Sequence, residues 1–264
     1  MPDNNPVENL FMSFCKQLLG VQKQTTNLGV LLELGQVPLV TLACGNAIKN
    51  WVRIVNNIKC NDNVVASYNA SVLENLSWST NIRLKLGEMG MGDLFIGGNG
   101  DSHLEAFQRM VDIFHQGAFS SIGRDDSKLR TYGLLKLAPG YETYLTDIKC
   151  IKERTALTKL RLSNHMLMIE KGRHQKLDRG CRFCPFCPGA VEDELHFLLD
   201  CGAYGCLRRE FLGGAGKIIN SLSYMDGVQK FCALINGAPL VTSRFVCRAS
   251  EVREFILRRH KGWD

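Results

Sequence analysis

Apolar residues recur along most of the chain at intervals of three and four positions, the spacing of one face of an α-helix. The clearest segment covers residues 7–19, with apolar side chains at 7, 10, 11, 14 and 18, and ends before Gly20. Similar patterns predict helices at 38–58, 102–115, 152–170, 205–212, 218–235 and 243–259. Shorter helices are predicted before Gly35, on either side of Ser77 within 64–86, and around Pro139 within 123–149. We therefore expect a mainly α fold, a bundle-like array of many helices.

Residues 89–100 contain five glycines and interrupt the helical pattern. A glycine-rich loop can cradle phosphate, but no strand precedes this one and no Gly-Lys-Ser/Thr sequence occurs in it. The favoured interpretation is an ordinary connecting loop.

Four residues in the last third of the chain have the spacing of a metal site. Cys184, Cys187, His196 and Cys201 follow the pattern C-x2-C-x8-H-x4-C. Two thiols from one tight turn, a histidine and a further cysteine can complete the tetrahedron that zinc prefers, and four protein ligands make a structural site. The alternative is a chance pair of buried free cysteines, because the chain has eleven cysteines. Cys181 and Cys206 are the nearest replacements for any of the four ligands.

Glu192, Asp193 and Glu194 precede His196. Carboxylates at the start of a helix interact favourably with its dipole, so we interpret the triplet as a cap. An acid–base cluster beside His196 is the alternative, but the chain lacks the His-Glu-x-x-His sequence of catalytic zinc sites.

The basic residues are concentrated just before these ligands. Residues 149–182 contain ten Lys or Arg and three Asp or Glu, a balance of +7 in a chain whose net charge is +6. A dense basic segment is the usual electrostatic signature of phosphate contact. The candidate nucleic-acid-binding residues are Arg154, Lys159, Arg161, Lys171 and Arg173, and we expect Arg161 and Arg173 to be exposed. The alternative is a solvated helix face without a ligand.

The same residues carry a family resemblance. Leu160 to Arg173 (LRLSNHMLMIEKGR), Arg182 to Cys187 (RFCPFC) and Val191 to Tyr204 (VEDELHFLLDCGAY) resemble the C-terminal, post-polymerase region of LINE-type (non-LTR) retrotransposon reverse-transcriptase polyproteins, including its CCHC zinc motif. Phe14 to Leu39 is similar to the segment that follows the polymerase domain. The resemblance implies a tail that helps to hold template RNA or target DNA, and a reverse transcriptase or another protein as a further partner.

No enzymatic activity is expected. The chain has no Asp-Asp pair in the strand-turn-strand setting of a polymerase, no cluster of paired carboxylates with a histidine as in a nuclease, and no nucleophile motif. The leading interpretation is a zinc-stabilised tail that binds RNA or single-stranded DNA. The alternatives are a helical protein-interaction adaptor with a purely structural zinc, and a non-functional remnant of an element.

Composition sets the remaining expectations. The fractions of apolar (45%) and charged (22%) residues are those of a globular protein. No apolar run approaches the length of a membrane span, the first residues do not resemble a signal peptide, and the cysteines lack a disulfide-type spacing, so we expect an intracellular protein of the nucleus or cytoplasm. Three regions are predicted: helices over 1–150, the basic helix and zinc module over 151–215, and C-terminal helices over 216–264 that pack on the rest.

Overall fold

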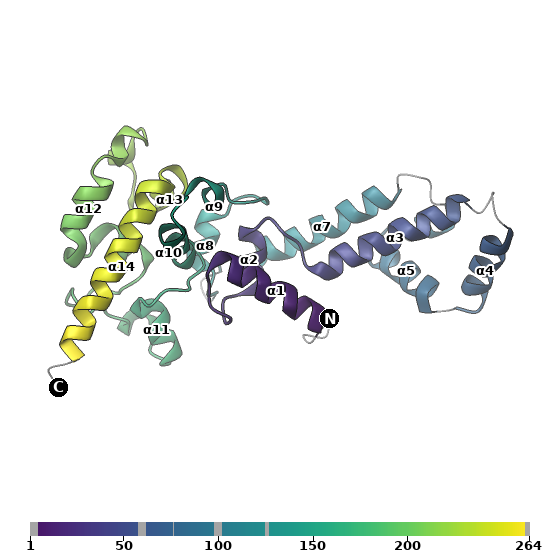
Figure 1. Cartoon of the computed structure of the whole chain (residues 1–264), viewed down its shortest axis with the longest axis horizontal. Helices are drawn as coiled ribbons and strands as arrows, with labels where there is room; N and C mark the ends of the chain where they lie inside the picture. The colour runs from purple at the N-terminus through teal and green to yellow at the C-terminus, as the bar shows by residue number, and fades with distance from the viewer. Residues whose placement is uncertain (1–4, 58–61, 76, 98–101, 125–126, 262–264) are drawn as a thin grey trace. The chain divides into compact units, whose positions relative to one another are not determined.

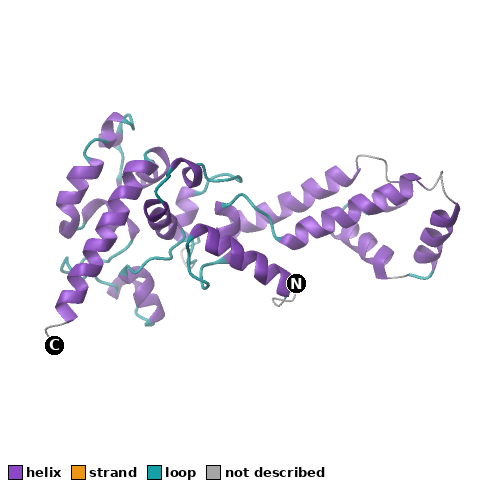
Figure 2. Cartoon of the chain, in the orientation of Figure 1, coloured by secondary structure: helices purple, strands orange, loops and turns teal. Residues whose placement is uncertain are grey.

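The computed structural model describes residues 5–57, 62–75, 77–97, 102–124 and 127–261. In this part of the chain the secondary structure is helical, and β-structure is limited to the isolated bridges Leu34–Tyr141 and Phe183–Val191 (Figure 2). The expectation of a mainly α fold is confirmed.

The chain forms two compact units. The first unit comprises Met1–Phe11 and Val37–Ser120, and the second comprises Met12–Gln36 and Ser121–Asp264. Residues 121–150 therefore group with the metal-site region, whereas the sequence pattern assigned them to a separate region over 1–150. Within this unit, Glu142 pairs with Arg161 of α10 (Ile151–Arg161) at 2.8 Å.

The first unit is built around a small apolar core. Its helices are α3 (Leu39–Asn57), α4 (Asp62–Leu73), α5 (Ser77–Glu88), α6 (Leu94–Gly97) and α7 (Ser102–Ser121), so the glycine-rich loop contains one short helix (Figure 1). Trp51 is 1% exposed and stacks on Phe95 at 5.5 Å between ring centroids. A Cβ added to Gly45 would lie 2.5 Å from the Phe107 ring, so glycine allows α3 to approach α7 closely. The core consists of Ile48, Trp51, Val52, Ile82, Leu86, Met89, Ala106 and Met110.

The first helix, α1 (Pro6–Leu19), supplies a cap for α3. The Glu8 carboxylate accepts hydrogen bonds from the backbone nitrogens of Leu39 and Val40 at 3.2 and 3.3 Å. A carboxylate at a helix N-terminus satisfies otherwise unpaired N–H groups and interacts favourably with the helix dipole.

The second unit surrounds its longest helix, α14 (Pro239–Lys261), which packs against α10 (Ile151–Arg161), α12 (Gly205–Leu212) and α13 (Gly227–Gly237) (Figure 1). A capping box starts α13, because Asp226 and Gln229 satisfy each other's backbone N–H groups. The other helices of this unit are α2 (Asn27–Glu33), α8 (Arg130–Leu135), α9 (Tyr144–Asp147) and α11 (Met168–His174).

The helix predicted over residues 152–170 is interrupted in the structure. α10 ends at Arg161 and α11 begins only at Met168. Between them Ser163 has a φ of 48°, in the left-handed region. Asn164, next to it, accepts a hydrogen bond from the Gln22 backbone nitrogen at 3.1 Å. Gln22 is far away in sequence, so periodicity within the segment could not reveal this break.

Arg161 is buried, and the expectation that it is exposed is wrong. Its side chain is 1% exposed, and its guanidinium donates to Glu33 at 2.6 Å and to Glu142 at 2.8 Å. A third hydrogen bond goes to the Asn236 side chain at 2.8 Å. Glu33 is 0% exposed, so its charge needs a buried cation. Arg161 therefore joins α2, α10 and α13 and is not available to a phosphate.

This network predicts a large effect on stability for Arg161→Gln. Removing one partner leaves Glu33 as an uncompensated buried charge, so the free energy of unfolding should fall by about 3–5 kcal/mol. Arg154→Gln is the matched control, because the guanidinium of half-buried Arg154 makes one hydrogen bond with the described residues, to the Ile148 carbonyl at 3.1 Å. Its loss should cost no more than about 1.5 kcal/mol. Urea unfolding measures the free energy of unfolding of both variants. Equally small decreases in the two would show that Arg161 does not stabilise the fold by neutralising Glu33.

Candidate metal centre

The structure brings the four predicted ligands together. One ligand atom from each of Cys184, Cys187, His196 and Cys201 lies within 4.8 Å of every other. The Sγ atom of Cys201 is 3.8 Å from that of Cys184 and 3.7 Å from that of Cys187. Cys181 and Cys206 are exposed and are not part of this cluster.

A tight turn places the first two thiols. Phe183 and Val191 form an antiparallel bridge, and the Cys184 backbone nitrogen donates to the Ala190 carbonyl at 2.7 Å. Gly189 allows this turn with a φ of 75°. Backbone N–H groups of Phe186 and Cys187 donate to the Cys184 sulfur. Hydrogen bonds of this kind stabilise thiolates, so the turn is suited to present two metal-binding sulfurs.

A π-helix places the other two ligands, where the sequence pattern predicted an ordinary short helix. Residues His196–Asp200 form this π-helix, and the Cys201 backbone nitrogen donates to the His196 carbonyl at 2.8 Å. In an α-helix, residues five apart point about 140° away from each other. The i→i+5 bond of a π-helix instead closes one turn over that distance. The spacing of five positions between His196 and Cys201 therefore lets both side chains reach the same ion.

The geometry of the cluster fits a tetrahedral ion. Zinc–sulfur bonds of about 2.3 Å in a tetrahedron place sulfurs about 3.8 Å apart, close to both observed distances. The Nε2 atom of His196 is buried and has no hydrogen-bond partner among the described residues, as expected of a nitrogen reserved for a metal. Three sulfurs and one nitrogen are a donor set typical of closed structural zinc sites.

The protonation of the thiols couples metal binding to pH. Burial raises the pKa of the Cys184 thiol, and it raises the pKa of Cys201 to about 12. Without an ion these sulfurs therefore keep their protons at neutral pH. A bound divalent cation favours the thiolates and releases those protons, so affinity for the ion should rise with pH.

Neighbouring elements support the cluster. From α12, the Arg208 guanidinium donates to the carbonyls of Leu198 and Cys201 at 2.8 and 3.0 Å. Phe197, beside the ligand His196, packs edge-on against Tyr204 at 5.1 Å and lies 5.9 Å from Phe245 of α14. The ligand turn is therefore anchored to the helices of the second unit.

The first carboxylate of the acidic triplet has a structural role that the sequence did not indicate. Glu192 is 1% exposed and receives hydrogen bonds from the Arg253 guanidinium of α14 at 2.8 and 2.7 Å. It also accepts from the Met168 backbone nitrogen at 2.6 Å and thereby caps α11. The expected cap is also present, because the Asp193 carboxylate accepts a hydrogen bond from the His196 backbone nitrogen at 2.8 Å at the start of the helix that carries this ligand.

Glu194 is also buried, at 1% exposure, and interacts with His165 at 3.0 Å, Thr131 at 3.1 Å and Arg130 at 3.6 Å. Burial alone would raise the pKa of Glu194, but the hydrogen bond and charge of His165, with the charge of Arg130, lower it to about 2. Its carboxylate is therefore ionised and occupied by partners. Arg253, His165 and Arg130 were missed as partners because no local sequence signal links them to the triplet.

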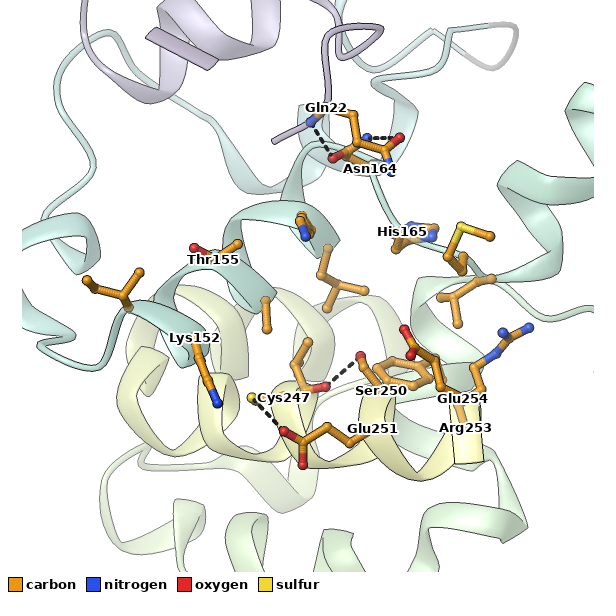
Figure 3. Close-up of a pocket in the computed structure, with 18 residues that line it drawn as sticks. Gln22, Lys152, Thr155, Asn164, His165, Cys247, Ser250, Glu251, Arg253 and Glu254 are labelled. Carbon is orange, nitrogen blue, oxygen red and sulfur yellow. Dashed lines mark hydrogen bonds between the residues drawn. The ribbon is translucent and has the colours of Figure 1, made fainter. Parts of the chain in front are cut away.

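The basic residues of the predicted stripe do not form one surface. Lys171 and Arg173 are exposed on α11, where Arg173 pairs with Glu170 at 2.8 Å. Half-buried Lys159 lines a groove between α10 and α14 with a volume of about 550 Å³, drawn in Figure 3. Lys152 and Lys159 come from α10 and Glu251 and Glu254 from α14, so the charge of the groove is mixed.

Comparisons of the chain with protein-family models, with curated protein sequences and with solved structures find no match. In the described part of the chain, no helix is both long and apolar enough to cross a membrane.

The ligand assignment predicts the behaviour of Cys187→Ser. The variant should lose the metal, and residues 180–205 should exchange their amide hydrogens faster, because metal affinity is folding free energy in such modules. Cys206→Ser is the control, since Cys206 is an exposed cysteine in the next helix. It should keep one ion per chain. Atomic emission and hydrogen exchange report the two effects, and an unchanged metal content in Cys187→Ser would refute the assignment.

Proposed function

We propose that the chain is a zinc-stabilised helical protein that binds RNA or single-stranded DNA through backbone phosphates and that it is not an enzyme. The observation that carries this proposal is an exposed basic segment fixed directly beside the metal ligands. Lys171, Arg173, Lys176 and Arg179 are all exposed, and Asp178 is the one acidic residue among positions 171–182.

This basic segment is held in a defined shape. The Arg182 guanidinium donates to the Ile169 carbonyl at 2.7 Å and to the Leu177 carbonyl at 3.1 and 3.0 Å. It therefore folds the segment back on α11. A Cβ added to Gly172 would lie 2.6 Å from the Arg182 side chain, so glycine is needed for this close packing. A zinc ion at the next turn would fix the other end of the segment.

Contact with phosphate explains the exposed basic side chains of this segment better than ion pairs within the protein do. Lys176 and Arg179 are exposed and make no side-chain hydrogen bond or ion pair with the residues that the structure describes. Exposed lysines and arginines that neutralise phosphates release condensed counterions, which gives binding that is sensitive to salt and tolerant of sequence. The resemblance of the segment to a retrotransposon tail supports the same class of ligand.

A second candidate function, a protein-interaction adaptor, is favoured by α1. Val7, Leu10, Phe14 and Leu18 recur at helical spacing and are 59%, 72%, 61% and 61% exposed. Exposed apolar side chains on one helix face are typical of surfaces that bind another protein. In that case the zinc would only stabilise the fold.

Salt dependence separates the two functions. With about four to six phosphate contacts, the logarithm of the association constant should fall against the logarithm of salt concentration with a slope of roughly −3 to −5, at about 0.7–0.9 per contact. Replacing Lys176 and Arg179 together by Gln should make the slope shallower by about one to two. Fluorescence anisotropy with a labelled oligonucleotide measures the salt slopes of the wild type and of the double variant.

The control for this experiment is the double variant Arg248→Gln/Arg258→Gln, which removes the same charge from exposed positions on α14. Its slope should stay close to that of the wild type. Absence of salt-dependent binding by the wild-type protein to RNA and to single-stranded DNA would leave the adaptor as the better interpretation.

A further inference from the structure

A second cleft lies beside α11, with a volume of about 330 Å³. One side is formed by Gln22 and Asn164, which Figure 3 shows bonded to each other. Lys128, Lys171 and His174 bring cationic or titratable groups to the same cleft. The cleft lies wholly within the second unit.

These three basic side chains have no internal partner. Within the ranges that the structure describes, the Lys128 and Lys171 ammonium groups and the His174 ring make no hydrogen bond or ion pair. Glu170 also lines the cleft, but Arg173 binds its carboxylate at 3.2 and 2.8 Å through Nε and Nη2. The acidic group at the site therefore already pairs with Arg173, and basic groups outnumber acidic groups in the cleft.

The environment of Lys128 adds to this imbalance. Lys128 is half-buried, and the pKa of its ammonium group is lowered by burial, raised by Glu170 and lowered by the nearby charge of Arg173. Burial and the charge of Lys128 in turn lower the pKa of Lys16, whose ammonium donates to the Lys23 carbonyl at 2.7 Å. The charge of Lys128 is thus repelled by that of Arg173 and repels that of Lys16, and a bound anion would relieve this repulsion.

We infer that this cleft binds a backbone phosphate of single-stranded RNA or DNA, with Lys128 and Lys171 as the contacts to its oxygens. The inference rests on the proposed function and assigns it a specific site. The volume is at the lower end of ligand pockets, about 300–1,000 Å³, and suits one phosphate with its sugar. Gln22, Gln24 and Gln175 provide amides that can hydrogen-bond sugar hydroxyls or phosphate oxygens.

The composition of the cleft also limits what it recognises. Its lining contains no phenylalanine, tyrosine or tryptophan, so among the described residues only the smaller rings of His165 and His174 could stack on a base there. Recognition at this site should therefore be of the backbone, with little preference among base sequences. A metal cation is a poor fit, because the lining carries more basic than acidic groups.

The test uses the full-length, zinc-loaded protein and a fluorescein-labelled oligo(dT) or oligo(U) 20-mer. Lys128→Gln and Lys171→Gln should each weaken binding about fivefold to eightfold at 0.1 M salt, the factor that a slope of 0.7–0.9 per contact gives relative to 1 M salt. Each should also reduce the salt slope by about one. Lys128→Arg keeps the charge and should stay within about twofold of the wild type.

Lys217→Gln is the matched control, because Lys217 is exposed in the same unit and outside this cleft. This variant should show only the small loss of affinity that follows from removing one positive charge outside the binding site. Circular dichroism verifies folding, and exposed Lys171 provides a readout even if Lys128→Gln is destabilised.

The possible results distinguish an error in the assigned site from an error in the proposed function. If the wild type binds the 20-mer but both cleft variants behave like Lys217→Gln, the cleft is not the phosphate site while the proposed function stands. If the wild type binds neither oligonucleotide, both the function and the site are refuted. Binding of inorganic phosphate that requires Lys128, without binding of either 20-mer, would identify an anion site that is not for nucleic acid and would overturn the inference.

Discussion

Buried carboxylates that require matched cations organise the second unit. Glu33, Glu192 and Glu194 are each 1% exposed or less, and an isolated charge at such a position is strongly unfavourable. Arg161 matches Glu33 at 2.6 Å and Arg253 matches Glu192 at 2.7 Å. Arg130 matches Glu194 at 3.6 Å, and the His165 ring contacts the same carboxylate at 3.0 Å. Because each pair joins segments distant in sequence, satisfying the charges also specifies which helices lie together.

Two of these carboxylates connect the metal turn to the rest of the unit. Glu192 and Glu194 lie just before His196, and they bind α14, α11 and the residues that follow α10. The ligand turn is therefore attached to the helices by ion pairs on one side and by Arg208 and the Phe197–Tyr204 packing on the other. A zinc ion would join the two halves of the turn, with Cys184 and Cys187 on one side and His196 and Cys201 on the other. The basic segment that precedes it would then be presented as a rigid surface.

The sequence predicted those features whose causes are local. The spacing of Cys184, Cys187, His196 and Cys201 was sufficient to find the cluster, and apolar periodicity was sufficient for helices such as α12. Long-range causes were not visible. Arg161 looked like part of an exposed stripe because its partner Glu33 is 128 residues away, and the break at Ser163 depends on polar contacts with distant residues. The π-helix was missed because its pattern over five residues resembles that of an α-helix.

The central claim is that one ion bound by three sulfurs and one nitrogen holds the turn on which these elements meet. X-ray absorption at the zinc edge of the purified protein tests it most directly, because it reports the type and distance of the ligand atoms. The account predicts one zinc per chain, with three sulfurs at about 2.3 Å and one nitrogen at about 2.0 Å. A first shell made of oxygen and nitrogen alone, or a sulfur count other than three, would contradict it.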